Sequence, residues 1–224
     1  MIRLFVGYDP NEAAGYHTFC HSVITRASEP VSITPIIKNQ FSEWNREGES
    51  NGATEFSFSR FLVPYLCKYR GHAIFVDGAD MLCLGDIAEL WALRDFSKSV
   101  QVVQHEAYQP EEVKMWNQEN RAYPRKNWSS VMIINCEYHH AYELTPENVA
   151  KKSGSWLHQF EWVQSEKRIG ALPPEWNVLV GHQTNKNAKL LHFTNGLPEV
   201  YPLNGIEDEM WDKERSAMNH VTPL

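Results

Sequence analysis

Short apolar segments alternate along the chain with longer segments in which apolar residues recur at helical spacing. Apolar segments of strand length occupy residues 2–8, 31–38, 73–76, 100–104, 131–135 and 189–193. Helical patterns occupy residues 9–27, 54–69, 87–93, 156–164 and 207–219, and a further short helix is predicted to begin at Thr145. Alternation of this kind predicts an α/β fold, with a mostly parallel twisted sheet flanked by helices.

Local signals place several ends of these elements. Asp9 and Pro10 are typical of a helix start, where a capping carboxylate precedes a proline in the first turn. Asp86 is expected to cap the helix at 87–93 in the same way. Pro35 lacks a backbone N–H and favours an edge position for the second strand, and Pro64 is expected to kink the helix at 54–69.

Length and composition limit the classes of protein that fit. With 224 residues and no repeat or linker, the chain is expected to form a single domain. The 21 Lys and Arg against 28 Asp and Glu give a net charge of −7, which argues against a nucleic-acid partner. The 4 cysteines do not pair by spacing, and no apolar run reaches membrane-spanning length. We therefore expect reduced thiols, no integral membrane segment and a cytoplasmic location.

Two carboxylates follow the buried segment at 73–76. Asp77 and Asp80 stand just beyond the end of that predicted strand, where open α/β sheets bind their ligands. Paired carboxylates suit a hard divalent cation such as Mn²⁺ or Mg²⁺. Residues three apart in a straight strand point to opposite faces, so both can meet one ion only if the chain turns, which Gly78 permits. The alternative is a polar turn in which Asp80 is only a cap.

A histidine ends the last predicted strand. His192 follows two leucines and precedes an Asn-Gly turn sequence. A lone histidine in this setting is most often a packed, hydrogen-bonded core residue. Its pairing with Asp77 and Asp80 makes it a candidate third metal ligand.

Several segments together resemble glycosyltransferase family 8, which has a GT-A-type fold. The carboxylate pair is followed by Gly85-Asp86-Ile-Ala-Glu-Leu-Trp91, which is similar to the segment after the family's Asp-x-Asp motif. Matches in the family's order are Arg60-Phe61-Leu-Val-Pro64, Ser129-Ser130-Val-Met-Ile-Ile-Asn135, Leu172-Pro-Pro-Glu-Trp176-Asn177 and Leu191-His192-Phe-Thr. The matches extend from the first strand to about residue 200.

The resemblance implies a retaining hexosyltransferase that moves a sugar from a nucleotide-diphosphate donor, most simply a UDP-sugar, to a sugar or glycan acceptor. It implies Mn²⁺ or Mg²⁺ as cofactor, held by Asp77, Asp80 and His192. Residues 1–104 would form the nucleotide and metal half, and residues 105–224 the acceptor half. By analogy with the family and the position of the first strand, the donor would contact Gly7, Tyr8, Asp9, Arg60 and Asp77.

The chain also departs from the family pattern. Its two aspartates are one residue further apart than in Asp-x-Asp, and Leu197-Pro198-Glu199 stands where the family has a lysine. Weak candidates for the catalytic residue are Gln159, His105 and Glu106. Alternative functions are a sugar- or nucleotide-binding protein that has lost turnover, and a metal-dependent phosphohydrolase.

The polar stretch at 39–53 is expected to be a lid that orders over bound donor and metal. Its Trp44 would then cover the donor sugar. The alternative is an ordinary exposed loop with Trp44 packed against the domain.

Overall fold

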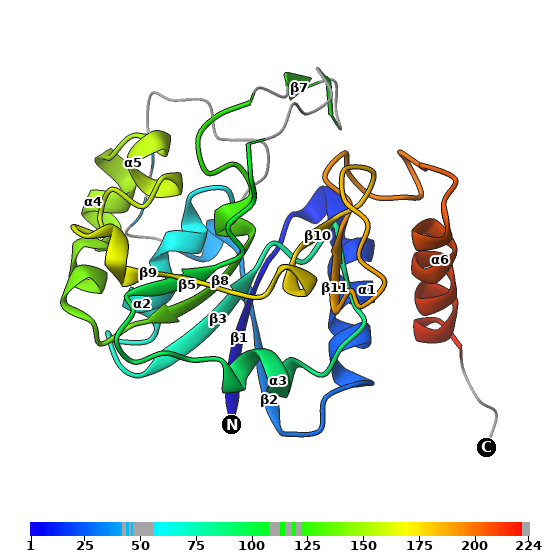
Figure 1. The fold of residues 1–224 in the computed structure, drawn as a ribbon, viewed down its shortest axis with the longest axis horizontal. Helices are drawn as coiled ribbons and strands as arrows, with labels where there is room; N and C mark the ends of the chain where they lie inside the picture. Colours follow the sequence, from blue (N-terminus) through cyan, green and yellow to red (C-terminus); the bar gives the residue numbers. More distant parts are fainter. Residues whose placement is uncertain are drawn as a thin grey trace.

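The computed structural model describes residues 1–41, 44, 46, 56–107, 113–114, 118–119 and 122–220. In this part of the chain the central sheet has six strands in the order β2-β1-β3-β8-β5-β9 (Figure 1). Their bounds are β1 Ile2–Gly7, β2 Val31–Ile36, β3 His72–Val76, β5 Val100–Val102, β8 Val131–Asn135 and β9 Ile169–Ala171. β1 pairs in parallel with β2 and β3, and β5 with β9, while β8 runs antiparallel to both β3 and β5. The mixed α/β class is confirmed.

A smaller sheet lies beside the central one. Its three strands, in the order β10-β11-β4, are β10 Val178–Leu179, β11 Leu190–His192 and β4 Met81–Cys83. β11 pairs in parallel with β10 and antiparallel with β4. A short antiparallel pair joins β6 (Val113–Lys114) to β7 (Gln118–Glu119).

Helices cover both faces of the central sheet (Figure 1). They are α1 Ala13–Ile24, α2 Val63–Leu66, α3 Ile87–Ala92, α4 Pro146–Lys151, α5 Gly154–His158 and α6 Ile206–Met218. Short 3₁₀ turns occupy Pro10–Glu12, Lys38–Gln40, Ser59–Leu62, Trp128–Ser130, His139–Glu143, Glu166–Arg168 and Pro174–Trp176. Among the helices that the structure describes, none is both long and apolar enough to cross a bilayer.

The capping signals are confirmed. The Asp9 side chain accepts from the Asn11 N–H at 2.9 Å, and the Asp86 side chain accepts from the Ala88 N–H at 2.9 Å. β2 is an edge strand, as Pro35 predicted.

The helix predicted at 54–69 is wrong in its extent. Within the described residues, the segment forms the 3₁₀ turn Ser59–Leu62 and then the single turn of α2. Pro64 does not kink a helix; it lies in the first turn of α2, where a missing N–H costs nothing. Lys68 and Tyr69, both with positive φ, end the segment.

Alternation along β1 shows how the sheet separates two cores. Phe5 faces the cluster under α2, α4 and α5, whereas Leu4 and Val6 face the cluster that α1 and α3 cover. A third cluster joins the small sheet to α6 through Trp211. The sheet is therefore buried on both faces, which leaves its carboxyl-end edge for a ligand site.

Glu214 joins α6 to α1. Its two carboxylate oxygens lie 2.6 Å from His21 Nδ1 and 2.7 Å from Arg26 Nη2. Burial acts to raise the pKa of Glu214, but the hydrogen bonds from Arg26 and His21 bring it below its ordinary value. Since the folded-state pKa is lower than the unfolded value of about 4.3, this stabilisation is present above that pH and is lost as pH falls through the folded-state pKa.

We therefore expect Glu214→Gln to lower the melting temperature at pH 7, with a difference from wild type that shrinks as pH falls below about 4. Thermal unfolding followed by circular dichroism across this range measures the difference. Glu209→Gln, an exposed change on the same helix, is the control and should have little effect at either pH. A Glu214→Gln difference that does not depend on pH would contradict this role.

Candidate functional site

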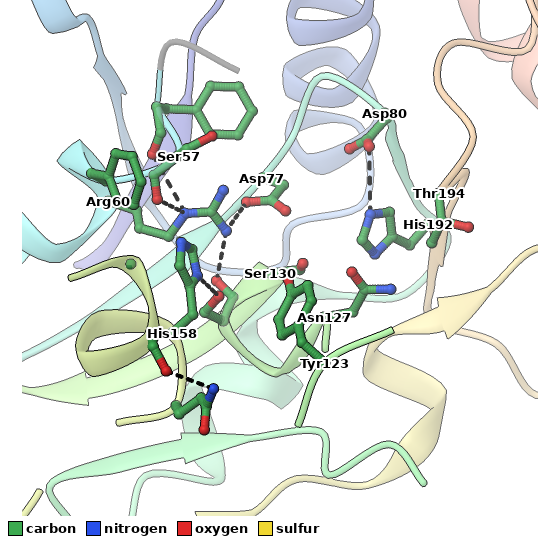
Figure 2. Close-up of a pocket in the computed structure, with 16 residues that line it drawn as sticks. Ser57, Arg60, Asp77, Asp80, Tyr123, Asn127, Ser130, His158, His192 and Thr194 are labelled. Carbon is green, nitrogen blue, oxygen red and sulfur yellow. Dashed lines mark hydrogen bonds and ion pairs between the residues drawn. The ribbon is translucent and has the colours of Figure 1, made fainter. Parts of the chain in front are cut away.

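A cavity of about 520 Å³ opens at the carboxyl ends of β1 and β3 (Figure 2). Its lining residues come from both halves of the chain: Phe56, Ser57, Phe58, Arg60, Asp77, Asp80, Tyr123, Asn127, Ser129, Ser130, Gly154, Ser155, His158, Gln159, His192 and Thr194. A cavity at this edge of an α/β sheet is where such folds bind ligands.

Asp77 forms a buried ion pair with Arg60 on one side of the cavity. Arg60 Nη1 lies 2.5 Å from Asp77 Oδ1, and the side chains are 7% and 12% exposed. Arg60 also donates from Nη1 to the Ser129 carbonyl at 3.0 Å and from Nε to the Ser57 carbonyl at 3.0 Å. The hydrogen bonds and the ion pair of Arg60 to described residues use Nη1 and Nε, and its Nη2 can donate to a ligand. Burial raises the pKa of Asp77, and the charge of Arg60 opposes that rise.

A tight turn separates the two aspartates, as Gly78 predicted. Gly78 has φ +83°, and a Cβ there would lie 2.2 Å from the Val6 side chain. The Ala79 N–H donates to the Asp77 carbonyl at 3.0 Å and the Met81 N–H to the Gly78 carbonyl at 3.2 Å. The turn allows Asp77 and Asp80 to face the same cavity.

Asp80 lies opposite His192 on the other side of the cavity (Figure 2). Asp80 Oδ2 and His192 Nε2 are 3.4 Å apart. The antiparallel pairing of β4 with β11 sets His192 against Met81, next to Asp80, and the Phe193 N–H donates to the Asp80 carbonyl at 2.8 Å. Two segments more than a hundred residues apart in the chain therefore meet here through a three-residue strand.

Asn177 holds the His192 ring. Its Oδ1 lies 3.0 Å from His192 Nδ1, and its Nδ2 donates to the Asn127 carbonyl at 3.1 Å. Because the amide oxygen can only accept, Nδ1 carries a proton, and Nε2 is the ring nitrogen that faces Asp80. The resemblance included Asn177 in a matching segment, but the sequence did not assign it this contact.

The donor atoms on this side suit a divalent cation. A carboxylate oxygen and a neutral imidazole nitrogen are ligands that Mn²⁺ accepts. Across the described residues, no group of three or more His, Cys, Asp and Glu side chains is gathered in a metal-binding arrangement. Asp80 and His192 therefore fit as two ligands, whereas the Asp77 carboxylate is held by Arg60.

Three of the residues predicted to contact the donor, Gly7, Tyr8 and Asp9, do not line this cavity. A Cβ on Gly7 would lie 2.5 Å from the Phe56 ring and 2.8 Å from the Asp77 carbonyl, so close packing explains the glycine. Tyr8 packs edge-on against Tyr16, and Asp9 caps the turn that follows β1.

The three catalytic candidates occupy different places. Gln159 lines the cavity and donates from Nε2 to Ser155 Oγ at 2.7 Å. His105 is buried outside the lining, and burial followed by the charge of His192 lowers its pKa to about 4. Glu106 is exposed and does not line the cavity. Of these three candidates, only Gln159 lines the cavity.

Sequence reasoning missed a Ser-His contact in the cavity wall. Ser129 Oγ and His158 Nδ1 are 2.8 Å apart, and the His158 ring packs edge-on against Phe61. The only available signal was Ser129, which stands in the segment similar to the family's. His158, at the end of α5, stands in no motif that would have indicated a role in the site.

Most of the stretch at 39–53 lies outside the described residues. Trp44 is buried in the core against Phe41, with ring centroids 6.3 Å apart. It lines a separate cavity of about 430 Å³ and not the one that holds Asp80 and His192. The expectation that Trp44 covers the site is therefore wrong in this structure, because the core has already buried its side chain.

Known structures of similar shape are glycosyltransferases. LgtC, described as a galactosyltransferase in complex with donor and acceptor sugar analogues, superimposes with a TM-score of 0.58 at 11% identity, covering 99% of this chain and 98% of that one. The bifunctional glycosyltransferase WbbM gives a TM-score of 0.61 at 14% identity, covering 95% of this chain. This chain covers 51% of WbbM, about half its length. The fold is that of the GT-A glycosyltransferases.

The family assignment follows from sequence comparison. The sequence model described as "Glycosyl transferase family 8" matches residues 20–197, and the chain belongs to that family. "Protein CDI" of Arabidopsis thaliana is 42% identical over 206 residues, covering 88% of this chain and 78% of that protein. The expected family and fold are confirmed.

Proposed function

We propose that the chain transfers a sugar from a nucleotide-diphosphate donor to the hydroxyl group of an acceptor, with retention at the anomeric carbon. The acceptor oxygen forms the new bond to that carbon, the bond to the diphosphate breaks, and the hydroxyl proton leaves with the diphosphate or to solvent. A hexose from a UDP-sugar and a sugar or glycan acceptor are the substrates we favour. The family resemblance supports the donor class and retention.

The observation that carries this proposal is the convergence of Arg60, Asp77, Asp80 and His192 on one cavity at the carboxyl ends of β1 and β3. A diphosphate leaving group carries concentrated negative charge, and catalysis depends on groups that stabilise that charge as it develops. Arg60 is the cationic side chain of the wall, and its position suits contact with a phosphate oxygen.

Asp80 and His192 are the residues we propose to hold Mn²⁺ or Mg²⁺, with Asp77 as a third ligand if it exchanges Arg60 for the cation. A bound cation at this point supplies positive charge to the diphosphate in an otherwise acidic protein. Asn177 orients the His192 ring for this use, because its Oδ1 accepts a hydrogen bond from Nδ1–H and leaves Nε2 for the cation.

Gln159 is the side chain we propose to contact the reacting sugar. Its amide lies in the cavity wall at the end of α5, beside Ser155. A mutant of LgtC with an active-site glutamine changed to glutamate is among the similar structures, with a TM-score of 0.58, which supports a role for a glutamine in such a site. Residues 105–224, which include Gln159, would then contact the acceptor, and residues 1–104 the nucleotide.

A cytoplasmic location is also part of the proposal. The four cysteines are free thiols, the form that a reducing compartment maintains.

A second candidate function is binding of a nucleotide sugar without turnover. It is favoured by the loss of the lysine that the family has at this place, where the chain has Leu197-Pro198-Glu199. A phosphohydrolase remains the third candidate, supported by the carboxylate pair alone.

One assay distinguishes these functions. A panel of nucleotide sugars, with UDP-sugars first, is incubated with Mn²⁺ in the presence and absence of sugar acceptors, and nucleotide release is measured. We expect release that requires both protein and Mn²⁺ and rises with an acceptor, and proton NMR should show the donor's anomeric configuration in the product. Donor binding without release would favour a binding protein, and release of phosphate from simple monoesters would favour a phosphohydrolase.

A further inference from the structure

The small sheet presents opposite faces to the site and to α6. Along β11, Leu190 and His192 face inward, and Leu191 and Phe193 face the opposite way. The outward cluster contains Leu82, Val178, Val180, Leu191, Phe193, Leu197 and Trp211. Trp211 of α6 therefore packs on the back of the strand that carries His192.

Phe193 connects this cluster to both sides of the site. Its ring meets Trp211 edge-on, with centroids 5.5 Å apart. Its backbone N–H donates to the Asp80 carbonyl at 2.8 Å, and it directly follows His192 in the chain. Phe193 is therefore in contact with α6 on one side and with the segments of His192 and Asp80 on the other.

α6 also braces the turn between the two aspartates through α1. Glu214 ties α6 to His21 of α1 and to Arg26, which follows the end of α1. On the same helix, a Cβ at Gly15 would lie 2.1 Å from the Ala79 carbonyl oxygen. The backbone of α1 is therefore in direct contact with the Asp77–Asp80 turn, and Figure 1 shows α6 beside α1 at the edge of the molecule.

We propose that α6 is a brace that fixes Asp80 and His192 relative to each other, with Trp211 and Glu214 as its positioning residues. α6 lies beyond residues 20–197, the part that the family model matches. Trp211 is fully buried and Glu214 is 7% exposed, although the helix is otherwise strongly charged. The inference rests on the proposed function only in assigning the cation to Asp80 and His192.

The first measurement uses the full chain without metal or nucleotide. Amide hydrogen exchange reports on the Phe193 N–H, whose bond to Asp80 joins the two segments. We expect Trp211→Ala to speed exchange at this amide by about tenfold or more, because its packing partner is lost. Met210→Ala, at a neighbouring position that is 40% exposed, is the control and should leave exchange unchanged.

The second measurement is the affinity for Mn²⁺ with UDP present, determined by calorimetry well below the melting temperature of each variant. Groups that orient metal ligands typically change affinity by about 10–100-fold, and we expect Trp211→Ala to weaken Mn²⁺ binding by about tenfold or more. Trp211→Phe should restore most of the affinity. A role limited to stability would lower the melting temperature but leave the affinity of the folded protein unchanged.

Unchanged exchange at Phe193, or faster exchange with unchanged Mn²⁺ affinity, would overturn the brace. If Trp211→Ala does not fold, Glu214→Gln is judged by the same criteria. If wild type itself fails to bind Mn²⁺ with UDP, the proposed function is wrong, and the exchange measurement alone then decides whether α6 braces the strand.

Discussion

Asp80→Asn is expected to abolish Mn²⁺-dependent binding of a nucleoside diphosphate. Asp80 and His192 are the carboxylate and imidazole that already approach each other within 3.4 Å. An amide oxygen carries no charge, so the variant loses both a ligand and the attraction to the cation. Loss of a residue that only orients a metal ligand typically lowers metal affinity by about 10–100-fold. We therefore expect loss of this ligand itself to weaken Mn²⁺ binding by about a hundredfold or more.

Calorimetry of Mn²⁺ binding in the presence of UDP measures the effect. Asp95→Asn, a change at an exposed aspartate that caps a turn elsewhere, is the control and should bind like wild type. We expect Asp77→Asn to be less damaging than Asp80→Asn, because Asp77 is already paired with Arg60. Equal binding by Asp80→Asn and wild type would remove Asp80 from the site.

Arg60→Ala is expected to destabilise the free protein as well as to weaken donor binding. The guanidinium is buried among Asp77 and the carbonyls of Ser57 and Ser129. Removing one partner of a buried ion pair typically costs about 3–5 kcal/mol, because the remaining charge is left unpaired. For a chain of this size that corresponds to a fall of roughly 10 °C in melting temperature.

A double variant tests the origin of this loss. Arg60→Ala combined with Asp77→Asn should recover much of the stability, since the uncharged amide no longer needs a cation. For donor affinity, Arg60→Lys keeps the charge but loses the fork of donors, and we expect about tenfold weaker binding of a nucleotide sugar. An Arg60→Ala protein that melts like wild type would contradict the buried pair.

Local signals made much of the fold predictable. The caps at Asp9 and Asp86 and the edge position of Pro35 depend on neighbouring residues alone, so the sequence contains them. The strands β4, β9 and β10, with two or three residues each, were missed. β4 is the strand that brings Asp80 to His192. The sequence proposed this pair from the chemistry of the side chains and from the resemblance, but it did not show how the two segments meet.

The parts of the site that the sequence did not reveal are contacts between distant segments. The hydrogen bond between Ser129 and His158 and that from His192 to Asn177 depend on how strands and loops pack. Trp44 shows the opposite error, because a tryptophan in a polar stretch was interpreted as a cover for the site although the core buries it. Gly7 was predicted to contact the donor from its place at a strand end, and the structure adds its close packing against Phe56, which the sequence did not show.

Anomalous diffraction at the manganese absorption edge, from crystals grown with Mn²⁺ and UDP, tests the central claim most directly. The account predicts a manganese peak within bonding distance of Asp80 and His192, with the diphosphate bound to the same ion inside the cavity beside Arg60. A nucleotide bound away from this cavity, or manganese bound without Asp80 and His192, would contradict it.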